Sequence, residues 1–400
     1  MANESNLTDV QRQMFEKIAK NEASEFRALL TQNKGSVNFV DENGMSPLQH
    51  ACYKGNKEIV QMLLDQGADV NYCQHGANYT SLHFAALNGN PEIVLLLLEA
   101  GVKPNTENSV NRTAAQMAAF VGNHHCVAII NNFVPKSEVE YYSILQGQQT
   151  EPYLPPALVD GFHKFVIQVN LHPVRIALNL QKVGTLADHL KKIKKVLELM
   201  TEREIKKKYD RSEVMAFKYH YLGWIVGEII RCQEHFHSRR EQGSTESRHD
   251  FVEMFAKRVL KENKPGQPDY IEYTIRDCAR EFPFRECTIF KQVVTQLANP
   301  EAPPALEVLK NAINGHRGFM DDITYCSSCG EEKPDKKCSK CKEVQYCDRE
   351  CQRLHWFVHK KSCARPTSSS ASAERSSAQT NKREIDTAEI TEQLQGLVAS

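Results

Sequence analysis

Apolar and polar positions recur with a period of 33–34 residues along the first third of the chain. The segment GMSPLQHACYKGNKEIVQMLLDQGADVN at 44–71 aligns with YTSLHFAALNGNPEIVLLLLEAGVKPN at 79–105. Within each copy a glycine separates two apolar stretches, and the second stretch has helical spacing, as in Ile59, Val60 and Leu63. The pattern therefore predicts two helices per copy, whose apolar faces become buried only when the copies stack.

Two less regular copies flank this pair. Residues 112–133 continue the period, and residues 15–38 form an earlier half-matching copy. The copies resemble the ankyrin repeat, with SPLQ and TSLH where that family has Thr-Pro-Leu-His. We predict about four ankyrin repeats over 1–135, with the first and last irregular. The last copy reads TAAQ and lacks the GAD ending, as expected of a C-terminal cap.

The resemblance to ankyrin repeats also suggests a binding surface. Positions between the signature and the following glycine usually face the concave groove of the solenoid. Here most of them are apolar or aromatic, a composition typical of protein-binding patches. The candidate concave face consists of Tyr53, Phe84, Leu87, Met117 and Phe120. Alternatively, the helical middle of the chain packs back over this face.

The rest of the chain divides by composition. Residues 136–160 are predicted to form a linker, because Pro152, Pro155 and Pro156 disfavour helix. Residues 161–320 are expected to be helical, with one helix near 186–200 and another at roughly 212–240. Residues 364–400 are rich in Ser, Thr and Ala and are expected to be disordered. The expected fold class is mainly α.

Charge and hydropathy limit the function classes. The 400 residues include 50 basic and 50 acidic side chains, so no net charge attracts the chain to nucleic acid or to a membrane surface. Its apolar stretches are far shorter than the roughly 18 residues of a transmembrane helix, and no signal peptide is evident. We therefore expect a soluble intracellular protein. Seven of its 13 cysteines fall between 326 and 363, a clustering unlike a disulfide framework.

That short segment holds eight candidate metal ligands in four closely spaced pairs. Thiolate and imidazole are the donors that zinc prefers, and a structural zinc site is closed by four of them. The pattern therefore predicts two zinc ions, which stabilise a segment too short to fold on a hydrophobic core. The predicted ligands are Cys326, Cys329, Cys338, Cys341, Cys347, Cys351, His359 and Cys363.

The segment resembles a MYND zinc finger, including Tyr346, Gln352 and Trp356. The resemblance implies an interleaved pairing, with the first and third ligand pairs on one zinc and the second and fourth pairs on the other. It also implies that short Pro-x-Leu-x-Pro peptides bind beside Gln352 and Trp356. Nine basic and six acidic side chains, combined with seven thiolates and two Zn²⁺, leave the segment near neutrality. It is therefore better suited to binding protein than DNA.

A peptide of the same type lies within the chain. The sequence PYLPP at 152–156 reads Pro152-x-Leu154-x-Pro156. One hypothesis is that this peptide occupies the groove of the chain's own finger or of a second copy. The alternative is an ordinary proline-rich linker.

The sequence favours an adaptor over an enzyme. MYND fingers also occur in SET-type lysine methyltransferases, but the chain has no Asn-His-Ser-Cys stretch, P-loop, dinucleotide fingerprint or nucleophile elbow. The order of its segments resembles adaptors that combine ankyrin repeats with a MYND finger. That resemblance implies a cytoplasmic and ciliary protein that traffics signalling membrane proteins such as cyclases, with chaperone-like or Pro-rich partners. The alternative is a nuclear corepressor-like adaptor that recruits Pro-x-Leu-x-Pro regulators.

Overall fold

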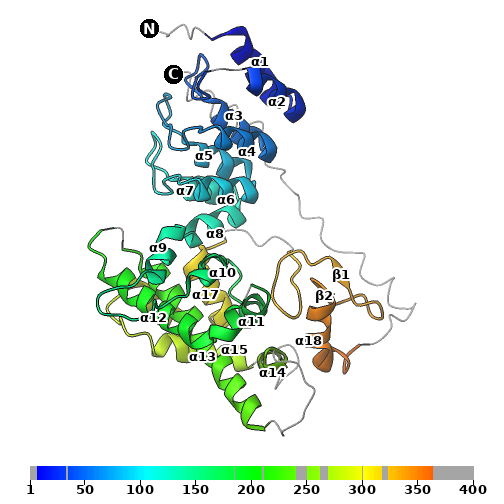
Figure 1. Cartoon of the computed structure of the whole chain (residues 1–400). Coiled ribbons are helices and arrows are strands. Elements are labelled where there is room, and N and C mark those ends of the chain that lie inside the picture. The colour runs from blue at the N-terminus through cyan, green and yellow to red at the C-terminus, as the bar shows by residue number, and fades with distance from the viewer. Residues whose placement is uncertain are drawn as a thin grey trace. The chain divides into compact units, whose positions relative to one another are not determined.

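The structure is a computed structural model that describes residues 7–32, 35–183, 185–209, 211–239, 250–261, 269–299, 301–317 and 323–363 (Figure 1). The described residues form two compact units, one ending at Cys126 and the other running from Val127 to Cys363. Both are mainly α-helical, which confirms the predicted fold class. The C-terminal segment expected to be disordered lies outside the described residues.

The N-terminal helices form four consecutive pairs that match the four sequence copies. The pairs are α1 (Asp9–Ala19) with α2 (Ala23–Gln32), α3 (Pro47–Lys54) with α4 (Lys57–Asp65), α5 (Ser81–Asn88) with α6 (Pro91–Glu99), and α7 (Ala114–Phe120) with α8 (His124–Asn132). The last helix of the series continues into the second unit.

Local sequence explains where these helices begin and end. Ser46, Thr80 and Thr113 each cap the first helix of a pair, and each cap is part of a reciprocal capping box with the residue three positions later. Gly55 and Gly89 end α3 and α5 with φ of 75° and 78°, a left-handed conformation that glycine adopts without penalty. The resulting turns return the chain for the second helix of the pair.

Asparagines spaced 33 residues apart join neighbouring repeats. The Asn38 side chain donates to the Gly67 carbonyl at 3.3 Å, and it accepts a bond from the backbone N–H two residues beyond that glycine at 2.8 Å. Asn71 makes the same two bonds one repeat later, to the Gly101 carbonyl at 3.3 Å and from the N–H two residues beyond it at 2.9 Å. The period in the sequence therefore reproduces the same bonds between successive loops.

The signature position has a similar role in two repeats, although its residue type differs. Gln49 stands where the family has histidine, and its amide donates to the Tyr72 and Tyr79 carbonyls at 3.0 and 2.8 Å. His83 keeps the family residue, and its Nε2 lies 3.0 Å from the Arg112 carbonyl. Both side chains are fully buried, and each satisfies its polar atoms by bonding a loop carbonyl.

The second unit is built around the long helix α13 (Glu213–Arg239), which packs against most of the other helices of the unit. Those helices are α9 (Lys136–Glu140), α10 (Val159–Val166), α11 (Pro173–Lys182), α12 (Leu190–Lys206), α14 (Asp250–Val259), α15 (Asp269–Arg280), α16 (Thr288–Ala298), α17 (Ala305–Asn314) and α18 (Arg349–His359). Short 3₁₀ helices lie at Tyr141–Ser143, Pro156–Leu158 and Leu186–His189, and β1 (Lys336–Lys337) pairs with β2 (Gln345–Tyr346). The helices predicted near 186–200 and 212–240 correspond to α12 and α13.

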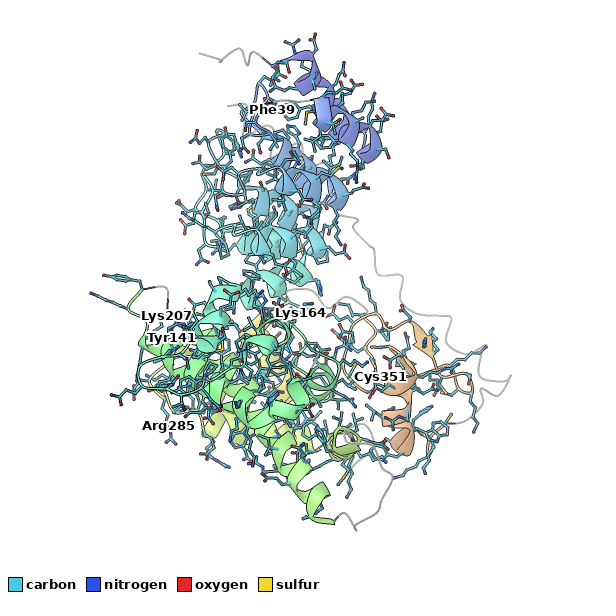
Figure 2. The ribbon with its side chains drawn as sticks, in the orientation of Figure 1. Phe39, Tyr141, Lys164, Lys207, Arg285 and Cys351 are labelled. Atoms are coloured by element: carbon cyan, nitrogen blue, oxygen red, sulfur yellow. The ribbon has the colours of Figure 1, made fainter. Side chains whose placement is uncertain are left out.

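The expected linker at 136–160 is instead a packed part of this unit. It contains α9 and two 3₁₀ helices, and Val139, Tyr142, Leu154 and Leu158 are buried in the core. Tyr141 at its surface lies under the Arg203 guanidinium at 4.0 Å and is labelled in Figure 2. The prolines limit helix length here, but the apolar side chains between them anchor the segment.

One buried residue of α13 is unusual. The Lys218 side chain is fully buried, and its Nζ has no hydrogen-bond partner among the described residues. Burial lowers the pKa of Lys218 well below its ordinary value, because the charged form loses its hydration. Lysine is almost never fully buried without a partner, so this residue lowers the stability of the unit.

Within the described ranges, no helix has both the length and the apolar character that crossing a bilayer requires.

Candidate metal centre and interaction surfaces

The eight predicted ligands come together in two groups of four. The Sγ atoms of Cys326, Cys329, Cys347 and Cys351 all lie within 4.8 Å of one another. We call this group the four-cysteine centre. It combines the first and third ligand pairs along the chain, as the resemblance to MYND fingers implies.

The second group completes the finger. Ligand atoms of Cys338, Cys341, His359 and Cys363 also lie within 4.8 Å of one another, and all four residues are buried. We call this group the histidine-containing centre. His355 belongs to neither group, and its Nδ1 lies 3.0 Å from the hydroxyl of the buried Tyr346.

The distances fit zinc. A tetrahedral zinc with Zn–S bonds of about 2.3 Å separates its sulfur atoms by about 3.8 Å, and a sulfur from an imidazole nitrogen by about 3.5 Å. In the four-cysteine centre, Cys329 Sγ lies 3.6 Å from Cys347 Sγ and 3.7 Å from Cys351 Sγ. Thiols and imidazole without carboxylates also exclude a calcium or magnesium site.

The histidine-containing centre fits equally well. Cys338 Sγ lies 3.8 Å from Cys363 Sγ, and His359 Nε2 lies 3.5 Å from Cys341 Sγ and 3.3 Å from Cys338 Sγ. The structure thus supports two zinc ions. Bound there, zinc would cross-link the finger, since every position of each tetrahedron is filled by protein.

Local structure places the ligands. Asp348 caps α18 by accepting the backbone N–H of Cys351 at 2.8 Å. Cys351 is labelled on this helix in Figure 2, and α18 also carries His359 two turns later. Gly330 has a φ of 64°, and a Cβ on it would lie 3.2 Å from the His172 ring. The turn that follows Cys326 and Cys329 therefore needs glycine at position 330 in order to pack against His172 of the helical region.

The predicted peptide-binding residues also lie on α18, where the Trp356 ring packs edge-on against the ring of the ligand His359, with 5.9 Å between centroids. Trp356 is 45% exposed and Gln352 is partly exposed. They are separated by one helical turn, so both reach the same strip of surface. An exposed tryptophan is typical of a protein-binding site.

Contacts between the finger and the helical region are a feature that sequence reasoning missed. Asn170 Nδ2 donates to the Cys329 carbonyl at 3.1 Å and to Glu331 at 3.0 Å, and Arg175 lies 2.9 Å from the same carboxylate. Lys182, at the end of α11, pairs with Glu350 at 3.0 Å. The finger is therefore packed into the second unit, and no local pattern in the sequence indicates these partners.

The structure also revises the candidate concave face. Phe120 and Tyr53 are exposed, at 78% and 38%, and Leu87 is partly exposed. Phe84 and Met117 are buried, at 8% and 7%, so their assignment to an open surface was wrong. Phe84 makes edge contacts with Tyr53 and with a second tyrosine, which cover its ring.

The peptide motif at 152–156 does not reach the finger's surface as a free segment. Leu154 is fully buried in the helical core, and its N–H donates to the Tyr142 carbonyl at 2.9 Å. Occupying a peptide groove would require this segment to leave its own core. The hypothesis that it fills the groove is therefore not supported.

Comparison with known proteins identifies both modules. Residues 16–108 match the family of ankyrin repeats (3 copies), and residues 326–363 match the MYND finger family. The chain thus contains ankyrin repeats and a MYND zinc finger, two modules that bind other proteins.

One relative is similar over most of the chain. Dauer abnormal formation protein 25 of Caenorhabditis elegans is 29% identical over 359 residues, which cover 88% of this chain and 89% of that protein. Two others from the same organism match locally. E3 ubiquitin-protein ligase hecd-1 is 35% identical over 109 residues (27% of this chain and 4% of that protein), and SET domain-containing protein 14 is 44% identical over 41 residues (10% of each).

Proposed function

We propose that this protein is a non-enzymatic adaptor that traffics signalling membrane proteins, such as cyclases, to the cilium. The observation that carries the adaptor role is the presence of two protein-binding modules in separate compact units of one chain. The ciliary destination and the cargo class follow from the resemblance of the segment order to adaptors of this kind. A cytoplasmic location between synthesis and delivery is part of the same proposal.

Each module presents exposed apolar side chains that suit a protein partner. On the repeats, Phe120 and Tyr53 remain accessible. On the finger, Trp356 has the exposure of a residue that contacts peptide. We propose that the repeats bind the cargo and that the finger binds a second partner, either chaperone-like or Pro-rich.

Point variants test this division better than deletions do. Removing 326–363 would expose the helical surface around Asn170 and Arg175, and captured proteins would then reflect misfolding. Phe120→Ala and Trp356→Ala each remove one exposed side chain, although the Trp356 ring also packs edge-on against the ligand His359. Each variant and the wild type would be expressed in ciliated cells, and neighbouring proteins would be identified by proximity labelling.

The expected result is that Phe120→Ala loses ciliary membrane proteins while Trp356→Ala keeps them. The rival adaptor role in the nucleus is favoured by the same exposed Trp356, which suits Pro-x-Leu-x-Pro peptides. Capture of chromatin regulators by the wild type, lost in Trp356→Ala, with no ciliary proteins in either sample, would support that rival and refute the ciliary proposal. Turnover of a small substrate by the purified protein would refute both.

A further inference from the structure

The two zinc centres lie in opposite electrostatic surroundings. The sequence within three residues of the ligands of the histidine-containing centre contains six lysines, one arginine and two acidic residues. The equivalent windows around the ligands of the four-cysteine centre contain four acidic residues and two arginines. A Zn²⁺ with four thiolates carries a charge of about −2, and one with three thiolates and a histidine about −1. The more negative centre is thus the one with the more acidic neighbours.

The acidic residues around the four-cysteine centre are paired with cations from outside the finger. Glu331 pairs with Arg175, Asp348 and Glu350 pair with Lys182, and the fourth, Glu332, pairs with an arginine just before the finger. Two arginines lie within three residues of the ligands of the four-cysteine centre. One of them, Arg353, pairs with Glu253 of α14, which offsets its charge.

Arg175 is the central member of this set. Its side chain is 25% exposed, and that of its partner Glu331 is 35% exposed, so water screens their charges only in part. Burial alone would lower the pKa of Arg175, but Glu331 and the thiolates of Cys329, Cys347 and Cys351 raise it. The guanidinium therefore lies within the field of these thiolates as well as that of its carboxylate partner.

We propose that α11 supplies the positive charge that the four-cysteine zinc centre lacks, with Arg175 as the principal residue. The finger's own lysines compensate the charge of the histidine-containing centre. The zinc of the four-cysteine centre, in contrast, needs the helical region for full affinity. Arg175 is not one of the eight ligands and pairs with Glu331, so it is a charge-compensating residue that acts on the site through its field.

The test measures zinc release from each centre of the full-length protein. Zinc transfer to a chromophoric chelator gives the rates, and cadmium-113 NMR of the cadmium-loaded protein distinguishes a site with four sulfur ligands from one with three sulfurs and a nitrogen. In Arg175→Gln we expect release from the four-cysteine centre to be about 10–100 times faster, as for other residues just outside a metal's ligands. Release from the histidine-containing centre should change less than about threefold, because its lysines are untouched.

The matched control is Lys191→Gln. Lys191 is an exposed lysine of α12 that pairs with Glu234 of α13, so the variant removes the same charge without altering the finger's partners. We expect wild-type release from both centres. Equal acceleration of both centres in Arg175→Gln, or none at the four-cysteine centre, would overturn the proposal.

A second variant separates charge compensation from simple docking. Glu331→Gln removes a negative charge but keeps an oxygen that accepts from Asn170. If the Arg175–Glu331 pair only docked the finger, both single variants would release zinc faster. Charge compensation predicts opposite signs, so Glu331→Gln should hold the zinc of the four-cysteine centre as tightly as the wild type or more tightly. The double variant should also recover part of the loss.

This comparison keeps the proposal testable if Arg175→Gln fails to fold. In that case Glu331→Gln alone decides between the two accounts, and Arg175→Lys, which keeps the charge, should release zinc at close to the wild-type rate. Faster release from Glu331→Gln would refute the proposal.

Discussion

Replacing Lys218 by methionine should stabilise the second unit. The side chain is fully buried, and its Nζ has no hydrogen-bond partner in the described part of the chain. Methionine has a similar length and flexibility but no charge to desolvate, so it fits the same space. We therefore expect Lys218→Met to raise the free energy of unfolding.

The magnitude follows from the proton that folding removes. Burial lowers the pKa of Lys218 well below its ordinary value, so folding favours loss of a proton that the unfolded chain holds. Neutralising a lysine at pH 7 costs up to about 4.6 kcal/mol, taking an unfolded pKa of about 10.4 and about 1.36 kcal/mol per pH unit. This value is the largest gain expected from the substitution.

The sign of the pH dependence distinguishes this cause from better packing. Between the lowered folded pKa and the unfolded pKa, the unfolded state binds one proton more, so wild-type stability rises with pH. The advantage of Lys218→Met should therefore shrink by about 1.4 kcal/mol for each pH unit as pH rises towards 10. A packing effect would give an advantage independent of pH.

Urea unfolding followed by tryptophan fluorescence measures this unit selectively. The chain has two tryptophans, Trp224 on α13 and Trp356 on α18, and both lie in the second unit. Lys191→Met, at a side chain that is 80% exposed, is the control and should stay within about 0.5 kcal/mol of the wild type at every pH. A Lys218→Met protein no more stable than the wild type, or one whose advantage does not change with pH, would refute the reasoning.

Three further predictions concern the metal and the repeats. Cys341→Ser should lower the zinc content in native mass spectrometry from two ions to one, and two retained ions would contradict the ligand set. The variant should also lose a large part of the roughly 10–16 kcal/mol of folding free energy that a structural zinc contributes. Leu97→Ala should cost about 2–5 kcal/mol in circular dichroism melts of the repeats, because the side chain is fully buried in α6; a cost below about 1 kcal/mol would contradict the packing. Gly89→Ala should cost at least about 1–2 kcal/mol, since φ is 78° and the added Cβ would lie 2.7 Å from the Asn123 side chain. The control Gly76→Ala has open space around it and should be nearly neutral, so equal effects of the two variants would exclude a conformational cause.

The repeats and the zinc ligands could be read from the sequence because both depend on local spacing. The period of 33–34 residues fixes where Gly55 and Gly89 turn the chain, and the paired cysteines define each pair of zinc ligands before any tertiary contact forms. Such patterns retain their meaning wherever the segment packs.

What the sequence did not show depends on residues far apart in the chain. Phe84 has the composition of a surface aromatic, but neighbouring rings cover it. Leu154 lies among prolines typical of a linker, yet the helical core buries it. The pairing of Arg175 with Glu331 joins residues 156 positions apart, and neither residue has a local pattern that reveals the other.

The asparagine bonds between successive repeats affect how the solenoid comes apart. Asn38 bonds the loop that begins at Gly67, and Asn71 does the same for the loop that begins at Gly101. Unravelling from the N-terminus therefore deprives each next loop of its donor, so loss of one repeat destabilises the following one. A pulling or proteolysis experiment should see the solenoid open in sequential steps of one repeat, starting at the N-terminal end.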